Sequence, residues 1–130
     1  MDKTLSIIKS MSDKNRLRVL NALLVHNELC ACQITEFLGV AGATTSRHLD
    51  LMVNAGVLKK RKQGRWIYFQ INRDDPSLTP LFRWVENRVE QCEQVKEDLQ
   101  VLKQKLVISC KELSQKQRER SACANSNKGE

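Results

Sequence analysis

Two cysteines separated by a single alanine, Cys30 and Cys32, carry the clearest chemistry in this chain of 130 residues. Thiolates are soft ligands that select soft, thiophilic ions. On a regular α-helix, residues two positions apart point about 200° away from each other, because each residue turns about 100°. The two sulfurs can therefore hold one ion only if the chain around them is frayed, extended or distorted.

A third ligand could come from Cys92, Cys110 or Cys123, from a small external thiol, or from none of these. Cys92 falls in an apolar helical stripe, so packing is an equally simple interpretation of it. Five unevenly spaced cysteines without a secretion signal argue against a structural disulfide framework. Reduced thiols that react with or ligate a soft partner fit this pattern better.

Helices account for most of the elements that must position these thiols. Apolar residues recur every three or four positions over the first third of the chain, and Asp13 can cap the second of its helices. Gly39 stops a helical stretch at 29–38, and Gly56 closes a further helix over about 43–54. Two short helices joined through a glycine form a helix-turn-helix pattern.

A β-hairpin follows this pair of helices directly. Residues 57–62 and 65–71 favour strands on either side of a turn around Gln63 and Gly64. A hairpin in this place is typical of a wing. The predicted fold is therefore mainly α with a small β-hairpin, a winged helix-turn-helix.

Beyond Pro76 the sequence predicts one long C-terminal helix that dimerises the protein. Its apolar seam repeats every seven residues, at Leu78, Val85, Cys92, Leu99 and Leu106. The rest of the chain is too short to supply a partner helix of that length, so a second copy is the expected partner. Residues 1–107 then form the DNA-binding and dimerisation domain, and 108–130 form a flexible polar tail.

Positive charge gathers at the tip of the predicted hairpin. The chain has 22 Lys and Arg against 15 Asp and Glu, and a net charge of +7 suits a polyanionic partner. The run KKRKQGR at 59–65 can reach a phosphate backbone or a minor groove through Lys60, Arg61, Lys62 and Arg65. On the preceding helix, the polar side chains that can reach base edges are Thr44, Ser46, Arg47 and His48.

Three segments together resemble the ArsR/SmtB family of metalloregulatory winged-helix repressors, particularly its arsenic-responsive members. They are ELCACQI at 28–34, SRHLDLMVNAGVLKKRKQGRWIYFQI at 46–71 and SMSDKNRLRVLNALL at 10–24. The resemblance implies a homodimer that represses transcription from double-stranded operator DNA. It also implies an inducer, arsenite or antimonite, that binds Cys30 and Cys32 and releases the operator.

The chain departs from the family's metal sites in ways that bear on the inducer. The arsenic sensors that it resembles carry a further cysteine three residues after the pair, where this chain has Thr35. The family's zinc site needs histidine on the dimerising helix, and His26 and His48 both lie far upstream, so that site is absent; His26 is most simply a helix C-terminal cap. The cadmium and lead site adds cysteines from an N-terminal arm, and no cysteine precedes Cys30.

No stretch approaches the roughly 18 apolar residues of a membrane span, and the N-terminus lacks the features of a secretory signal. We therefore expect a cytoplasmic DNA-binding protein that is neither an enzyme nor a membrane protein. One alternative is a repressor of the same fold that senses reactive sulfur or oxidants, through Cys30 or Cys32 bonded to Cys92. A thiol oxidoreductase is disfavoured because the chain has CxC rather than CxxC, and a DNA-packaging protein without an inducer is the third alternative.

Overall fold

Helix α2 (Lys14–Val25) begins and ends at the two capping residues that the sequence predicts, Asp13 and His26. The computed structural model describes residues 1–107 and 110–128, and the side chains of 1–107 and 111–120. Helix α1 (Asp2–Met11) ends just before Asp13. The Asp13 carboxylate accepts hydrogen bonds from the backbone N–H groups of Asn15 (2.8 Å) and Arg16 (3.1 Å) and so begins α2. His26 is the C-terminal cap of α2, as predicted.

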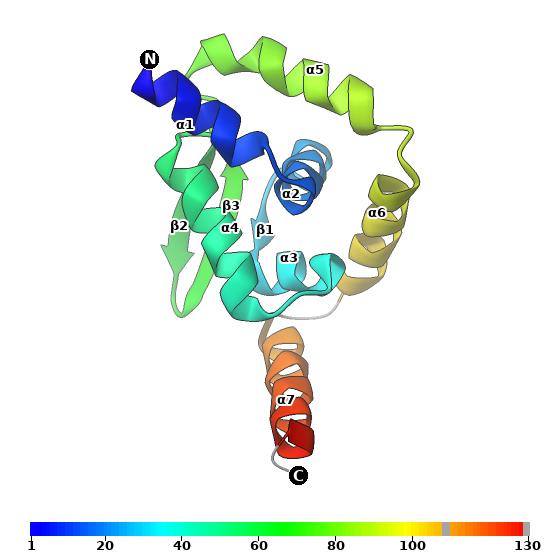
Figure 1. The fold of residues 1–130 in the computed structure, drawn as a ribbon. Helices are drawn as coiled ribbons and strands as arrows, with labels where there is room; N and C mark the ends of the chain where they lie inside the picture. Colours follow the sequence, from blue (N-terminus) through cyan, green and yellow to red (C-terminus); the bar gives the residue numbers. More distant parts are fainter. Residues whose placement is uncertain (108–109, 129–130) are drawn as a thin grey trace.

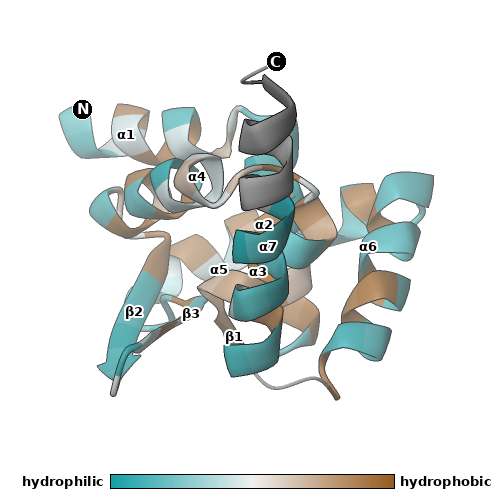
Figure 2. Ribbon diagram, turned by 90° about the horizontal axis from the view of Figure 1, so that it is seen from below, coloured by the Kyte–Doolittle hydropathy of each residue, from teal (hydrophilic) through white to brown (hydrophobic). Residues whose placement is uncertain are grey.

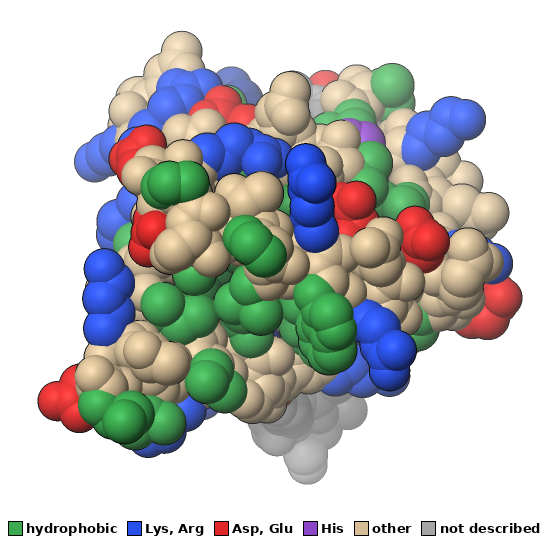
Figure 3. Space-filling view, turned by 90° about the horizontal axis from the view of Figure 1, so that it is seen from above, with side chains coloured by type: hydrophobic (Ala, Val, Ile, Leu, Met, Phe, Trp, Pro, Cys, Tyr) green, Lys and Arg blue, Asp and Glu red, His purple; other side chains and the backbone are tan. Residues whose placement is uncertain are grey.

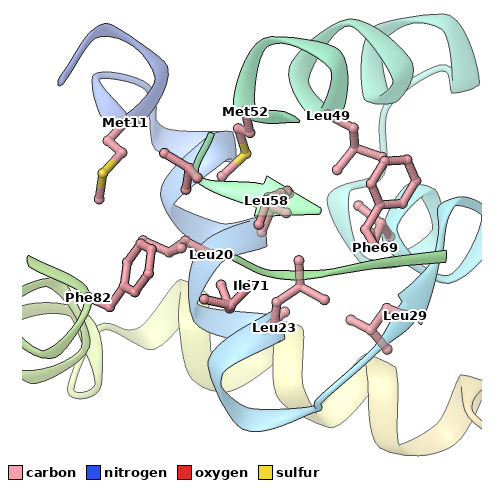
Figure 4. Packing of buried hydrophobic residues seen from close by; sticks show 14 of the residues in the cluster. Met11, Leu20, Leu23, Leu29, Leu49, Met52, Leu58, Phe69, Ile71 and Phe82 are labelled. Atoms are coloured by element: carbon pink, nitrogen blue, oxygen red, sulfur yellow. The ribbon is translucent and has the colours of Figure 1, made fainter. Parts of the chain in front are cut away.

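Helices α3 (Ala31–Leu38) and α4 (Gly42–Asn54) form the predicted helix-turn-helix pair. Gly39 ends α3 with φ 69°, a left-handed conformation that favours glycine. Leu49 and Met52 of α4 point into one core with Leu20 and Leu23 of α2, as Figure 4 shows. Helix α4 is therefore anchored to the same core as α2.

The wing contains three antiparallel strands, one more than the sequence predicts. Strands β2 (Leu58–Gln63) and β3 (Trp66–Ile71) form the expected hairpin, and β1 (Leu29–Cys30) pairs with the other edge of β3, which gives the order β1-β3-β2. The helix predicted from residue 29 is wrong for the first two residues. Leu29 and Cys30 instead lie opposite Phe69 and Tyr68 of β3, and Leu29 is completely buried.

The single long C-terminal helix is a wrong prediction. After the 3-10 turn η1 (Pro76–Leu78), helices α5 (Thr79–Val89) and α6 (Glu93–Lys105) are separated by a bend and run in different directions (Figure 1). Val85 of α5 and Leu102 of α6 are both buried in the core of this chain. A straight helix could not bring both residues to that core, so the bend allows much of the predicted seam to be buried within the chain.

A buried ion pair holds α6 against α2. The Arg18 guanidinium donates to both carboxylate oxygens of Asp98, at 2.9 and 2.8 Å, and also to the backbone carbonyl of Phe37 at 2.9 Å. The hydrogen bond to Asp98 raises the pKa of Arg18, against the opposing effect of burial. Sequence periodicity carries no sign of this pairing, because its partners lie 80 positions apart.

Helix α7 (Cys110–Lys128) lies where the sequence predicts a polar tail. It is hydrophilic along its described part and crosses α3, on which it packs (Figure 2). Its Leu113 is nevertheless completely buried. Among the described helices, none combines the length and apolar character that crossing a bilayer demands.

Candidate thiol site and nucleic-acid interface

Cys30 and Cys32 converge at the junction between strand β1 and helix α3. Cys30 is the N-cap residue of α3 and has an extended backbone (φ −83°, ψ 160°), while Cys32 lies in the first helical turn. Their Cα atoms are 5.5 Å apart, and a disulfide joins the two sulfurs. Two sulfurs at this spacing can hold one ion only if the chain departs from a regular helix. The extended backbone of Cys30 is such a departure.

Local interactions at this junction fix the backbone of the pair. The Cys30 N–H donates to the Gln33 side-chain oxygen at 2.9 Å, as in a capping box. Glu28, two residues earlier, receives two hydrogen bonds from the Arg61 guanidinium of the wing, at 2.7 and 2.5 Å. This hydrogen bonding lowers the pKa of Glu28. Arg61 therefore compensates the negative charge of Glu28 beside the pair.

The two cysteines form one wall of a pocket of about 300 Å³. Cys30 is 1% exposed and Cys32 is 7% exposed, and both pack with Leu113 of α7. Four elements supply the lining: the start of α3, the start of α4, the tip of the wing and α7. Beyond α3, the lining residues are Gly42 and Ser46 of α4, residues 65–67 of the wing, and Ser114 and Gln117 of α7. The thiol pair therefore shares a cavity with both elements that are predicted to contact DNA.

The structure leaves Cys92 apart from this pocket. Cys92 is an exposed thiol at the bend between α5 and α6, and it lines a different pocket, with residues of α1, α2 and α6. Thr35, at the position of the additional cysteine in the arsenic sensors, does line the thiol pocket, but its hydroxyl donates to the Ala31 carbonyl at 2.9 Å. Cys110 and Cys123 have side chains outside the described residues. Among the described residues, no cluster of three His, Cys, Asp or Glu side chains could hold a metal ion.

The outer face of α4 carries some of the predicted base contacts. Ser46 and Arg47 are exposed, and Thr44 is half-buried. His48 does not share this face, because its side chain is only 13% exposed and its Nδ1 lies 3.2 Å from the Arg16 guanidinium. The structure thus presents Ser46 and Arg47 together and turns His48 toward α2.

The wing presents three of its four predicted phosphate contacts without an intramolecular ion pair. Lys60, Lys62 and Arg65 are exposed, and none of them takes part in an ion pair within the described residues. Arg61 is instead held by Glu28 and lies 4.7 Å from the centre of the Tyr68 ring. Arg61 therefore braces the wing against the residue that precedes β1.

Sequence reasoning missed the contribution of α7 to the thiol pocket. Leu113, Ser114 and Gln117 surround the cysteines from a segment more than 80 positions away. The available signal was Leu113, the one large apolar residue between Lys111 and Arg120. A lone leucine in a polar helix has no periodicity, and so it gave no reason to expect burial.

Comparison with known proteins agrees with the resemblance seen in the sequence. A family model described as "Bacterial regulatory protein, arsR family" matches residues 13–60. The cadmium resistance transcriptional regulatory protein CadC of Listeria innocua is 40% identical over 63 residues, 48% of this chain and 53% of CadC, so the match spans about half the length of that relative. The arsenical resistance operon repressor of Escherichia coli is 30% identical over 95 residues, 71% of this chain and 76% of the repressor.

A solved structure gives the same assignment. The transcriptional repressor PagR of Bacillus anthracis superposes with a TM-score of 0.55 at 31% identity, over 65% of this chain and 93% of PagR. The winged helix-turn-helix, the matched segment and these relatives agree, and this chain belongs to the ArsR family of bacterial regulatory proteins.

Proposed function

We propose that this protein is a homodimeric transcriptional repressor that leaves its operator DNA when arsenite or antimonite binds Cys30 and Cys32. The observation that carries the proposal is the shared pocket, in which the thiol pair faces Ser46 of α4 and residues 65–67 of the wing. An ion held by two sulfurs there would bear on both elements at once. The protein would act in the cytoplasm, where the thiols of Cys30 and Cys32 stay reduced.

DNA contact is assigned to the exposed face of α4 and the tip of the wing. Arg47 can donate two hydrogen bonds to a guanine, and Ser46 can bond a base edge or a phosphate. Lys60, Lys62 and Arg65 add positive charge that is not neutralised by an ion pair within the described residues. His48 is withdrawn from this set because it lies against Arg16.

A second copy of the chain is the proposed cover for an apolar face over α1 and α5. Hydrophobic side chains gather on the side of the molecule seen in Figure 3. Ile8 of α1 is 55% exposed, and Trp84 of α5 is 60% exposed. Exposed apolar patches of this kind mark association surfaces. This face replaces the heptad seam as the dimer interface, because Val85 is buried within the chain.

The inducer is assigned by the chemistry of the pair and by the relatives. Two converging sulfurs suit a soft ion. One relative is an arsenical resistance repressor and another regulates cadmium resistance, so both ions belong in the first experiment. Arsenite takes precedence because its third ligand can be a small external thiol, whereas cadmium would need further protein ligands, and no cluster among the described residues supplies them.

A second candidate function is a redox switch, favoured by the disulfide that joins Cys30 to Cys32. It uses the two neighbouring thiols, whereas the predicted bond to Cys92 is disfavoured by the separate location of that residue.

One experiment distinguishes the candidates. Binding to the DNA upstream of the protein's own gene is measured in excess reductant with arsenite, antimonite or cadmium, and then with an oxidant or polysulfide in place of the metal. Release by arsenite under full reduction supports the proposal, and release only by the oxidant or polysulfide replaces it with the redox switch.

A further inference from the structure

The C-terminal helix α7 covers the thiol pair with very few contacts. Leu113 packs on Cys30 and Cys32 with no exposed surface of its own, and the remaining described side chains of α7 are polar or charged. Ser114 and Gln117 complete the wall of the thiol pocket. A reagent that approaches the sulfurs must therefore enter through this pocket or move the leucine.

Polar contacts fasten the same stretch of α7 to α3. The Gln117 amide donates to the Cys32 carbonyl at 2.8 Å and to Glu36 at 3.1 Å, and the Arg120 guanidinium donates to Glu36 at 2.8 Å. Lys105 of α6 lies 3.6 Å from the other Glu36 oxygen. Glu36 thus ties both C-terminal helices to the thiol-bearing helix.

The charge of Glu36 is maintained despite its burial. Its side chain is 8% exposed, and burial alone would raise its pKa. Hydrogen bonds from Arg120 and Gln117 outweigh that effect and hold the pKa below its ordinary value. The carboxylate is therefore ionised at neutral pH, and the attraction that docks α7 persists there.

We propose that α7 is a latch over the inducer site, in which docking of Leu113, Gln117 and Arg120 controls access to Cys30 and Cys32. One leucine, one buried carboxylate and a few hydrogen bonds hold the helix, so it can open without unfolding the domain. Gln117 and Arg120 also line the hollow over the α3–α4 turn, beside Gly39 and Gly42. Occupation of the thiol pair and docking of α7 are consequently coupled, and the regulatory meaning of this coupling rests on the proposed function.

Thiol modification kinetics test the latch without DNA or arsenite. The fully reduced, full-length protein is treated with iodoacetamide and digested with trypsin, which places Cys30 and Cys32 on one peptide (19–47) and Cys92 on another (89–96). Leu113→Ala is compared with the parent and with Val107→Ala, which shortens an exposed side chain near the start of α7. A third variant, Arg120→Gln, removes the ion pair between Arg120 and Glu36. The Arg120 side chain is itself exposed.

The latch predicts that Leu113→Ala speeds modification of peptide 19–47 by about tenfold or more. Arg120→Gln should increase the rate of modification of this peptide by a smaller factor. Cys92 should react at the same rate in every variant. Rates for peptide 19–47 within about twofold of the parent in both variants would overturn the latch, as would an equal rise at Cys92. If the rates rise as expected while arsenite fails to release DNA, the latch stands and the assignment of the inducer falls.

Discussion

Cys30 and Tyr68 lie directly opposite each other across the β1–β3 pairing. The Tyr68 ring in turn lies 4.7 Å from the guanidinium of Arg61, on the outer strand of the wing. One of the two cysteines is therefore part of the same sheet as the wing, and the other lies in the first turn of α3, the helix that precedes α4. A ligand that changes the geometry of the pair must act on both, which gives the proposed induction a physical route.

Arg47→Ala should weaken binding to the operator by about 1–3 kcal/mol, because it removes an exposed side chain that can bond bidentately to guanine. Binding to unrelated DNA should change much less. Fluorescence anisotropy with both DNAs measures the difference, and Lys103→Ala on α6 is the control because Lys103 is also an exposed cation but lies outside the proposed DNA and dimer surfaces. Equal weakening on both DNAs would make Arg47 a phosphate contact.

Lys60→Ala with Lys62→Ala should weaken binding to every sequence, since these lysines are assigned to phosphates. The slope of log affinity against log salt concentration should fall by about one for each lysine. Arg61→Ala should lower the slope less, because Arg61 is engaged by Glu28. An unchanged slope in the double variant would remove the wing from the interface.

Trp84→Asp should produce monomers that bind DNA poorly, because it places a charge in the apolar face over α1 and α5. Sedimentation velocity measures the oligomeric state. Val25→Asp is the control, since Val25 is similarly exposed (53%) but lies at the end of α2. If Trp84→Asp remains dimeric, the interface lies elsewhere on the molecule.

Glu36 should make stability dependent on pH in the acid range. Burial would raise its pKa, but hydrogen bonds from Arg120 and Gln117 hold the pKa below the ordinary 4.5, so the charged form stabilises the folded state above that value. This contribution is lost as the pH falls through the folded-state pKa. Glu36→Gln should therefore lose less stability than the parent between about pH 5 and pH 3 in urea unfolding. Glu90→Gln, at an exposed site, should follow the parent, and identical acid profiles for Glu36→Gln and the parent would refute the assignment.

The sequence predicted the elements whose signals are local and missed those that depend on distant partners. Asp13, Gly39 and the strand-favouring residues on either side of Gln63 and Gly64 each specify structure within a few positions, and the structure confirms them. The seven-residue repeat of α5 and α6 was misleading, because the same leucines and valines can pack within one chain or between two. The ion pair of Arg18 with Asp98, which joins α6 to α2, has no local signature in the sequence.

In the thiol site, too, the sequence predicted the local feature and missed the contacts with distant residues. The spacing of Cys30 and Cys32 indicated that the chain must depart from a helix, and the pairing of Cys30 with β3 supplies that departure. The enclosure by Leu113 and the diversion of Arg61 to Glu28 arise from tertiary contacts that no spacing in the sequence encodes.

The central claim is tested most directly by arsenite titration of the operator complex in excess reductant, with the parent protein and the Cys30→Ser, Cys32→Ser double variant. Neither cysteine is exposed, so both proteins should bind the operator equally well before arsenite is added. Arsenite should lower the parent's affinity for DNA by about 5- to 150-fold, the usual range of allosteric coupling, and should leave the double variant bound. Release of the double variant at the same arsenite concentrations would contradict the account.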